Sequence, residues 1–223
     1  MNAINHAATA LLINKRWPGV PIVAVLLAVQ LVEFLWVVFN LLGIEITTTA
    51  AQVRALNDIH LDYMPYSHSI AATAVLAFAV WVIFSKFLHK PIWGLALAVA
   101  VSTHVVLDLA THVHDIALAP GIESPKFGTG LYGVPLLALV VETVYGVWCW
   151  WLFRGSRALL AVIVVLNLAA LSFYAPRISG PESLLAGHPK IFAAAIGVHI
   201  VVGLLAVGWF ARRHWRFSAN DAR

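Results

Sequence analysis

Long apolar runs constrain the fold of this chain more than any other feature of its sequence. Of its 223 residues, 61% are hydrophobic and 11% are charged, and the mean hydropathy is +0.88. Soluble domains carry about 25% charged residues, so these values are typical of a chain that lies in lipid. Several runs approach the roughly 20 apolar residues that a helix needs to cross a bilayer. Because backbone polar groups in lipid must be satisfied internally, we expect an integral α-helical membrane protein.

The apolar runs predict six spanning helices in a single membrane domain that covers residues 1–223. We expect these spans at residues 20–44, 66–87, 91–112, 131–153, 158–175 and 191–210. Pro65, Pro91 and Pro176 lie at segment edges, where proline begins or stops a helix. The expected fold is an all-α, polytopic transmembrane bundle.

The basic residues predict which side of the membrane each loop occupies. If the N-terminus is inside, the inner side holds Lys15, Arg16, Lys86, Lys90, Arg154, Arg157, Arg212, Arg213, Arg216 and Arg223. The outer side then holds only Arg54, Lys126, Arg177 and Lys190. This asymmetry follows the positive-inside rule and predicts that both termini are cytoplasmic. It accounts for the net charge of +4 without a nucleic-acid partner. We assign the chain to the bacterial inner (plasma) membrane, among membrane lipids.

One predicted helix carries an unusual set of ionisable side chains. In STHVVLDLATHVHD, residues 102–115, the side chains of His104, Asp108 and His112 recur every four residues and share one helix face. At about 1.5 Å per residue they span about 12 Å, which is too long for one metal ion on a straight helix. Two residues of the stripe could therefore bind one metal ion together with ligands from other segments, or the stripe could belong to a two-metal site.

Side chains of matching chemistry lie on other predicted segments. HLDYMPYSHS carries Asp62 and His68 at the start of the second helix, and Asp115 follows the third. Glu33 and Glu142 lie in the first and fourth helices. Ionisable groups within a bilayer cost roughly 2.5 kcal/mol or more each on insertion scales, and a bound metal ion would offset that cost. We therefore expect a metal site in the outer half of the bundle.

Imidazole and carboxylate are ligands that zinc, iron and manganese accept. The expected ligands are His68, His104, Asp108, His112 and Asp62. One or two divalent ions would bind there, zinc being the first expectation and iron or manganese the alternatives. Such an ion lowers the pKa of a bound water molecule toward neutrality. Glu33 or Asp115 would then move the proton as an acid–base group.

DYMPYSHS and STHVVLDLATHVHD together resemble the membrane-bound metal-dependent hydrolase-like family of the YdjM type. Its members carry a histidine near the N-terminus, an acid in the first helix, an SHS-type motif and an SHxxLDxxTH-type motif. The matching positions here are His6, Glu33, Ser67-His68-Ser69, and His104 with Asp108 and His112. The resemblance covers roughly residues 1–153, including the loop GIESPKFGTGLYGVP, and implies a hydrolase. This chain has Glu33 where the family pattern has Asp, and Thr103 separates Ser102 from His104.

The position of His6 conflicts with this resemblance. The charge pattern places the first residues on the cytoplasmic side, away from His112. His6 could join the site only if the segment before Lys15 re-entered the membrane. We therefore do not expect His6 among the metal ligands.

Several functions are compatible with these residues. The first is an intramembrane metal-dependent hydrolase acting on a lipid or lipid-linked ester or phosphoester. Neither GxSxG nor HExxH occurs in the chain, so serine-hydrolase and zincin chemistry lack support. The alternatives are a metal-ion or proton transporter or channel and a haem-binding membrane subunit in which His104 pairs with His68 or His199. A polar clamp between helices would explain the same stripe without any ligand.

Overall fold

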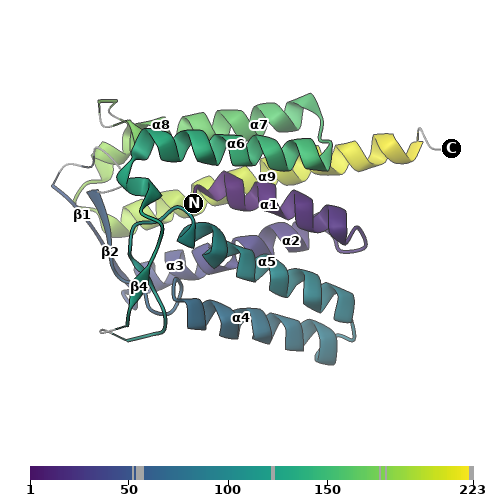
Figure 1. Cartoon of the computed structure of the whole chain (residues 1–223), viewed down its shortest axis with the longest axis horizontal. Helices are drawn as coiled ribbons and strands as arrows, with labels where there is room; N and C mark the ends of the chain where they lie inside the picture. The colour runs from purple at the N-terminus through teal and green to yellow at the C-terminus, as the bar shows by residue number, and fades with distance from the viewer. Residues whose placement is uncertain (52, 54–57, 122–123, 176, 179, 221–223) are drawn as a thin grey trace.

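The structure is a computed structural model of the whole chain, and it describes residues 1–51, 53, 58–121, 124–175, 177–178 and 180–220. Arg54 and Arg223, which the charge pattern assigned to opposite sides, lie outside these residues. Figure 1 shows the helices lying side by side as one elongated bundle, with short strands at one end and the C-terminus at the other. The expected helical bundle is therefore confirmed in its broad class.

Four helices of the described chain are long and apolar enough to cross a membrane. They are α4 (Ile70–Val82) continued by a π-helical turn (Ile83–Phe87), α5 (Pro91–Leu109), α6 (Pro135–Phe153) and the stretch Pro189–Arg212 of α9 (Pro189–Asn220). These spans are typical of an integral membrane protein.

The other two expected spans are not continuous helices. The first is α2 (Ile22–Val29) and α3 (Leu31–Leu42), which bend by 50° at Gln30 and count as one span only if taken together. The fifth is split at Ala170 into α7 (Arg157–Ala169) and the short α8 (Leu171–Tyr174). The six expected crossings thus become four long helices and a bent pair in the part of the chain described here, with α7 as a shorter apolar helix.

The helix α1 (Ala3–Arg16) lies in the middle of the bundle, and this differs from the expected position of the N-terminus. Figure 1 shows α1 between the other helices with the N-terminus inside the bundle. It packs against α2, α5, α6, α7 and α9, and Met1 is only 8% exposed. The small residues Ala7, Ala8 and Ala10 are buried on α1, which lets neighbouring helices approach closely.

The two ends of the bundle differ in chemistry. Lys15 and Arg16 end α1, Lys86 and Lys90 lie at the turn between α4 and α5, and Arg154 lies after α6. Figure 1 shows these turns at the same end as the C-terminus. We call this the basic end, and it matches the side that the positive-inside rule assigns to the cytoplasm.

Two antiparallel hairpins cover the opposite end, where the sequence predicted loops. Strand β1 (Ile46–Thr49) pairs with β2 (Ile59–Tyr63), and β3 (Ile116–Ala117) pairs with β4 (Lys126–Phe127). The predicted all-α class is corrected to this extent. We call this the hairpin end, and the site described next lies between it and the apolar core.

Candidate metal centre

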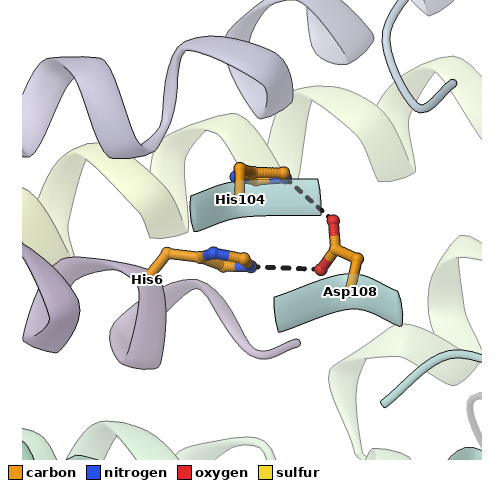
Figure 2. A group of neighbouring side chains, drawn as sticks. All are labelled: His6, His104 and Asp108. Carbon is orange, nitrogen blue, oxygen red and sulfur yellow. Dashed lines mark ion pairs between the residues drawn. The ribbon is translucent and has the colours of Figure 1, made fainter. Parts of the chain in front are cut away.

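The carboxylate of Asp108, near the hairpin end of α5, lies at the middle of a buried polar cluster. Its Oδ1 atom is 3.2 Å from His6 Nε2 and 2.6 Å from the α-amino nitrogen of Met1. Its Oδ2 atom is 3.1 Å from His104 Nε2. Figure 2 shows the two imidazoles reaching different oxygens of the one carboxylate. The sequence expectation that His6 stays away from the site is therefore wrong, because α1 begins inside the bundle.

A hydrogen bond fixes which nitrogen of His104 faces Asp108. His104 Nδ1 lies 2.9 Å from the carbonyl oxygen of Val29, the last residue of α2. A carbonyl oxygen can only accept, so Nδ1 carries the hydrogen and Nε2 presents its lone pair to the cluster. The bend at Gln30 brings the end of α2 to His104, so the broken span has a direct role in building the site.

Four buried atoms of this cluster make no hydrogen bond. They are His6 Nδ1, His6 Nε2, His104 Nε2 and Asp108 Oδ2. The rings of His6 and His104 stack with their centroids 4.0 Å apart and an interplanar angle of 11°. Buried polar atoms that make no hydrogen bond are expensive. His6 Nε2 and His104 Nε2 lie within ion-pair distance of Asp108, so either a proton on the ring or a bound cation would compensate the carboxylate. A bound metal ion would satisfy these atoms together.

A second group of ligand atoms shares His104. Glu33 Oε1 lies 3.6 Å from His68 Nε2 and 3.8 Å from His104 Nε2, and His68 Nε2 lies 3.9 Å from Asp108 Oδ2. In each group, His6–His104–Asp108 and Glu33–His68–His104, all the ligand atoms lie within 4.8 Å of one another. Tetrahedral zinc with bonds of about 2.0–2.1 Å would hold its ligand atoms about 3.3 Å apart. The donor set and its spacing could therefore hold a metal ion.

Glu45 and Ser67 orient His68, although no role was predicted for Glu45. The buried Glu45 carboxylate accepts hydrogen bonds from Ser67 N at 2.8 Å and from Ser67 Oγ at 2.6 Å. Since Ser67 Oγ gives its hydrogen to Glu45, it accepts from His68 Nδ1 at 2.8 Å. His68 Nε2 then faces Glu33. The only signal in the sequence was an acid directly after the first apolar run, in front of a polar loop.

His112 and Asp115 form a pair at the edge of the cluster. The Nδ1 atom of His112 lies 3.2 Å and 3.3 Å from the two carboxylate oxygens of Asp115, and its Nε2 atom is 3.8 Å from Asp108 Oδ1. Asp115, expected to move protons itself, instead contacts the imidazole of His112. Such a carboxylate–histidine contact fixes the tautomer of the ring, so Asp115 orients His112, and its role in proton transfer stays a prediction.

Asp62, an expected metal ligand, does not join these groups. It lies on β2, is exposed, and accepts a hydrogen bond from Thr48 Oγ1 on β1 at 2.5 Å. The sequence analysis placed this residue at the beginning of a helix, but strand pairing directs it to its neighbour across the hairpin. Asp62 still lines the cavity above the cluster.

Glu142 on α6 holds the beginning of α1 in place. Its carboxylate accepts from Asn2 N at 2.6 Å and Asn5 Nδ2 at 2.9 Å on one oxygen, and from the hydroxyls of Tyr132 at 2.9 Å and Tyr174 at 3.0 Å on the other. A carboxylate has about four acceptor positions, so Glu142 is fully used by these donors. It is a structural anchor for the segment that carries His6.

A cavity of about 760 Å³ opens beside the cluster. Glu33, His68, His112 and Asp115 line it on the site's side. Apolar side chains of α8 and α9 line it elsewhere, and Lys126 of β4 lies at its edge near the hairpins. The volume falls within the range of small-molecule sites, about 300–1,000 Å³.

No family model, curated protein or solved structure matches this chain. The resemblance to the YdjM-type family therefore rests on the motifs alone.

Proposed function

We propose that this chain is an intramembrane metal-dependent hydrolase that cleaves a lipid or lipid-linked ester or phosphoester. One observation carries the proposal: three imidazoles and two carboxylates from four segments converge beside a cavity, and several of their buried ligand atoms make no hydrogen bond. A clamp between helices would be expected to hydrogen-bond these atoms. The motif resemblance, which includes His6, supports the same proposal.

The residues have separable roles in such a site. His6, His104 and Asp108 would hold a divalent ion, and Glu33 and His68 would complete its surroundings or hold a second ion. The ion would act as a Lewis acid and make water a better nucleophile near neutral pH. His112 would accept the proton of the attacking water at Nε2, while Asp115 holds the ring by its Nδ1–H. Glu33 would place its carboxylate among the ligands of the ion.

The surroundings of the cluster favour hydrolysis over transport. Toward the basic end, the turns next to His6 and His104 carry mainly buried apolar residues, including Leu11, Leu97 and Val101. The buried polar residues of α1 there, Thr9 and Asn14, are uncharged. A path for protons or metal ions would need ionisable groups or water at that depth. In the described residues the cavity lies on the hairpin side of the cluster, as a substrate site requires.

Lys126 favours a phosphoester among the possible substrates. It is exposed, and it lines the cavity together with acids, histidines and apolar groups. Met1 also lines the cavity, but its α-amino group is already paired with Asp108. Among the described residues it has no ion-pair partner within 4.0 Å. A phosphate group of a substrate at the cluster would supply the matching charge.

The first test is the metal content of detergent-purified protein, measured by mass spectrometry. Wild type, with a C-terminal tag, is compared with the double variant His104→Ala/Asp108→Ala. We expect about one or two divalent ions per wild-type chain and loss of this metal in the variant. His188→Ala, which removes an exposed histidine outside both ligand groups, is the matched control and should keep its metal.

Lipid esters and phosphoesters are then screened side by side with the metal-loaded protein. Hydrolysis by wild type and its loss in the double variant would support the proposal. Sub-stoichiometric metal in folded wild type prepared without chelators would contradict it, and so would tightly bound metal with ion flux in liposomes.

A further inference from the structure

The C-terminal part of the chain, in which the sequence showed no motif, forms one wall of the cavity. Phe173 and Tyr174 of α8 line it, and so do Phe192, Ile196 and Ile200 of α9. These residues are apolar apart from the Tyr174 hydroxyl, which Glu142 already uses. His199 of α9 lines the same wall. The wall faces a cluster of imidazoles and carboxylates, so the cavity is polar on one side and mainly apolar on the other.

One small residue of this wall, Ala195, also belongs to the outer surface of the bundle. Ala195 lines the cavity and is exposed, and it lies on the same stripe of α9 as the exposed Ile191, Val198 and Val202. Residues spaced by three, four and seven positions share a helix face, and this face is apolar and belongs to a candidate membrane span.

The neighbouring helix shows the same arrangement. Ala169, the last residue of α7, lines the cavity and is exposed. It follows the exposed Ala161 and Val165 on one stripe of α7. Helices α7 and α9 pack against each other, and Leu166 contacts Gly203 nearer the basic end. The cavity is therefore lined on each of these two helices by a small exposed residue that belongs to an apolar stripe of the outer surface.

We infer that the cavity takes its ligand from the membrane through a lateral opening between Ala169 and Ala195, which we call the portal. The ligand is a phospholipid-type amphiphile. Its hydrocarbon chain lies against Phe173, Phe192 and Ile196, and its head group lies at the metal cluster.

This inference rests on the proposed function for the position of the head group, but the chain-binding wall and the portal stand on their own observations. The opening lies within the apolar surface that contacts lipid tails. A hydrocarbon chain can thus pass from the bilayer to the wall without crossing water, and only the head group meets polar residues.

The test uses a photoreactive lipid and does not require turnover. Phosphatidic acid with a diazirine in its acyl chain is added to the full-length protein in phosphatidylcholine liposomes. After irradiation, labelled peptides are identified by mass spectrometry. We expect labelling at Phe173, Phe192 and Ile196 in wild type. Ala195→Trp and Ala169→Trp should lower this labelling by about tenfold or more, which corresponds to about 1.4 kcal/mol.

Two matched controls separate the portal from general crowding of the surface. Ala161→Trp adds the same bulk to the same stripe of α7, and Ala194→Trp adds it to an exposed position of α9, and neither residue lines the cavity. Both should label like wild type. Equal labelling of wild type and the portal variants would overturn the inference, and so would equal loss in the controls.

A reversible block guards against misfolding of the tryptophan variants. In Ala195→Cys, a bulky thiosulfonate reagent should abolish cavity labelling, and dithiothreitol should restore it. The native Cys149 is fully buried and will not compete. Failure of the block to change labelling would contradict the portal.

The two proposals fail in different ways. Cavity labelling without bound metal would contradict the proposed hydrolase and support the portal. If the protein bound metal and hydrolysed a short-chain soluble phosphoester but showed no cavity labelling, the hydrolase would be supported and the portal contradicted.

Discussion

At His68 and His104, a hydrogen bond to the Nδ1 atom decides which ring nitrogen faces the centre. The Val29 carbonyl does this for His104, and Ser67, itself held by Glu45, does it for His68. These partners come from a helix break and from the residues before α4. Each imidazole is thus prepared for a ligand by a neighbour that contacts no ligand itself.

Replacing Ser67 by alanine tests this orienting role. Without the hydroxyl, the His68 ring loses the partner that fixes its tautomer, so metal affinity should fall about 10- to 100-fold. The measurement is a competition titration of metal-free protein against a chelating dye. Ser102→Ala is the control, because the Ser102 hydroxyl bonds only to the Ala98 carbonyl of its own helix. Equal affinities for Ser67→Ala and Ser102→Ala would refute the role.

Glu142→Gln should show whether Glu142 only holds the beginning of α1 in place or also binds the metal ion. A glutamine offers one acceptor oxygen in place of two, so at least one of the four buried donors loses its partner. We expect a loss of stability of about 1–3 kcal/mol with the number of bound ions unchanged at saturating metal. Glu33→Gln should do the opposite and weaken metal binding more than stability. Thermal unfolding in detergent and metal analysis of both variants would check this, and loss of metal stoichiometry in Glu142→Gln would make Glu142 a ligand.

At the scale of elements, the loop after β4 closes the end of α5. Thr129 N donates to the Leu109 carbonyl and Gly130 N to the His112 carbonyl, at 3.0 Å and 2.8 Å. The last carbonyls of a helix have no partner within it, so these bonds fix the turn that carries His112. A Cβ at Gly128 would lie 2.0 Å from the Val113 carbonyl oxygen, and its φ of 155° is rare for other residues.

Gly128→Ala should therefore displace this loop. We expect a loss of about 2 kcal/mol of stability together with weaker metal binding, because His112 and Asp115 shift with the loop. The control is Gly133→Ala, where an added Cβ meets nothing within 4 Å. Thermal unfolding and the dye titration read both effects. A Gly128→Ala protein as stable as Gly133→Ala would disprove the close fit.

The elements also show why the sequence predicted part of the site and missed the rest. His104 and Asp108 were predicted because residues four apart on one helix share a face whatever surrounds them. His6 was missed because the positive-inside rule reports where Lys15 and Arg16 lie and says nothing of how deep a preceding helix begins. Asp62 was misassigned because it was taken with the following helix, although Ile59–Tyr63 alternates apolar and polar residues as a strand does.

The spans show the same limit. Apolar runs predicted helices at about the right places, since lipid demands that backbone groups be satisfied. A hydropathy profile does not predict the bend at Gln30 or the break at Ala170, because the residues on both sides of each remain apolar. Both interruptions lie beside the site or its cavity, where tertiary contacts override the local pattern.

For the whole molecule, the ligands link segments that are far apart in the chain. His6, Glu33, His68 and Asp108 come from α1, α3, the segment before α4, and α5. An ion that holds them together binds only the folded bundle, so it stabilises the bundle by mass action. At a free ion concentration 100 times the Kd, the free energy of unfolding rises by about 2.7 kcal/mol.

Zinc should therefore raise the melting temperature of metal-free protein in detergent, and a chelator should reverse the change. The shift should vanish in His104→Ala/Asp108→Ala and persist in His188→Ala. Calcium, which prefers oxygen ligands in larger numbers, should give a smaller shift. An equal zinc-induced shift in the double variant would place the binding elsewhere in the molecule.

The central position of α1 has a consequence for biogenesis. This helix precedes its partners in synthesis, because Asn5 makes its hydrogen bonds with Glu142 and Asn167, which are synthesised more than 130 residues later. Until α6 and α7 have left the translocon, the first helix lacks these partners and His6 has no fixed place beside Asp108. Assembly of the complete centre thus follows insertion of the later helices, and chains interrupted before residue 167 should reach the membrane without it.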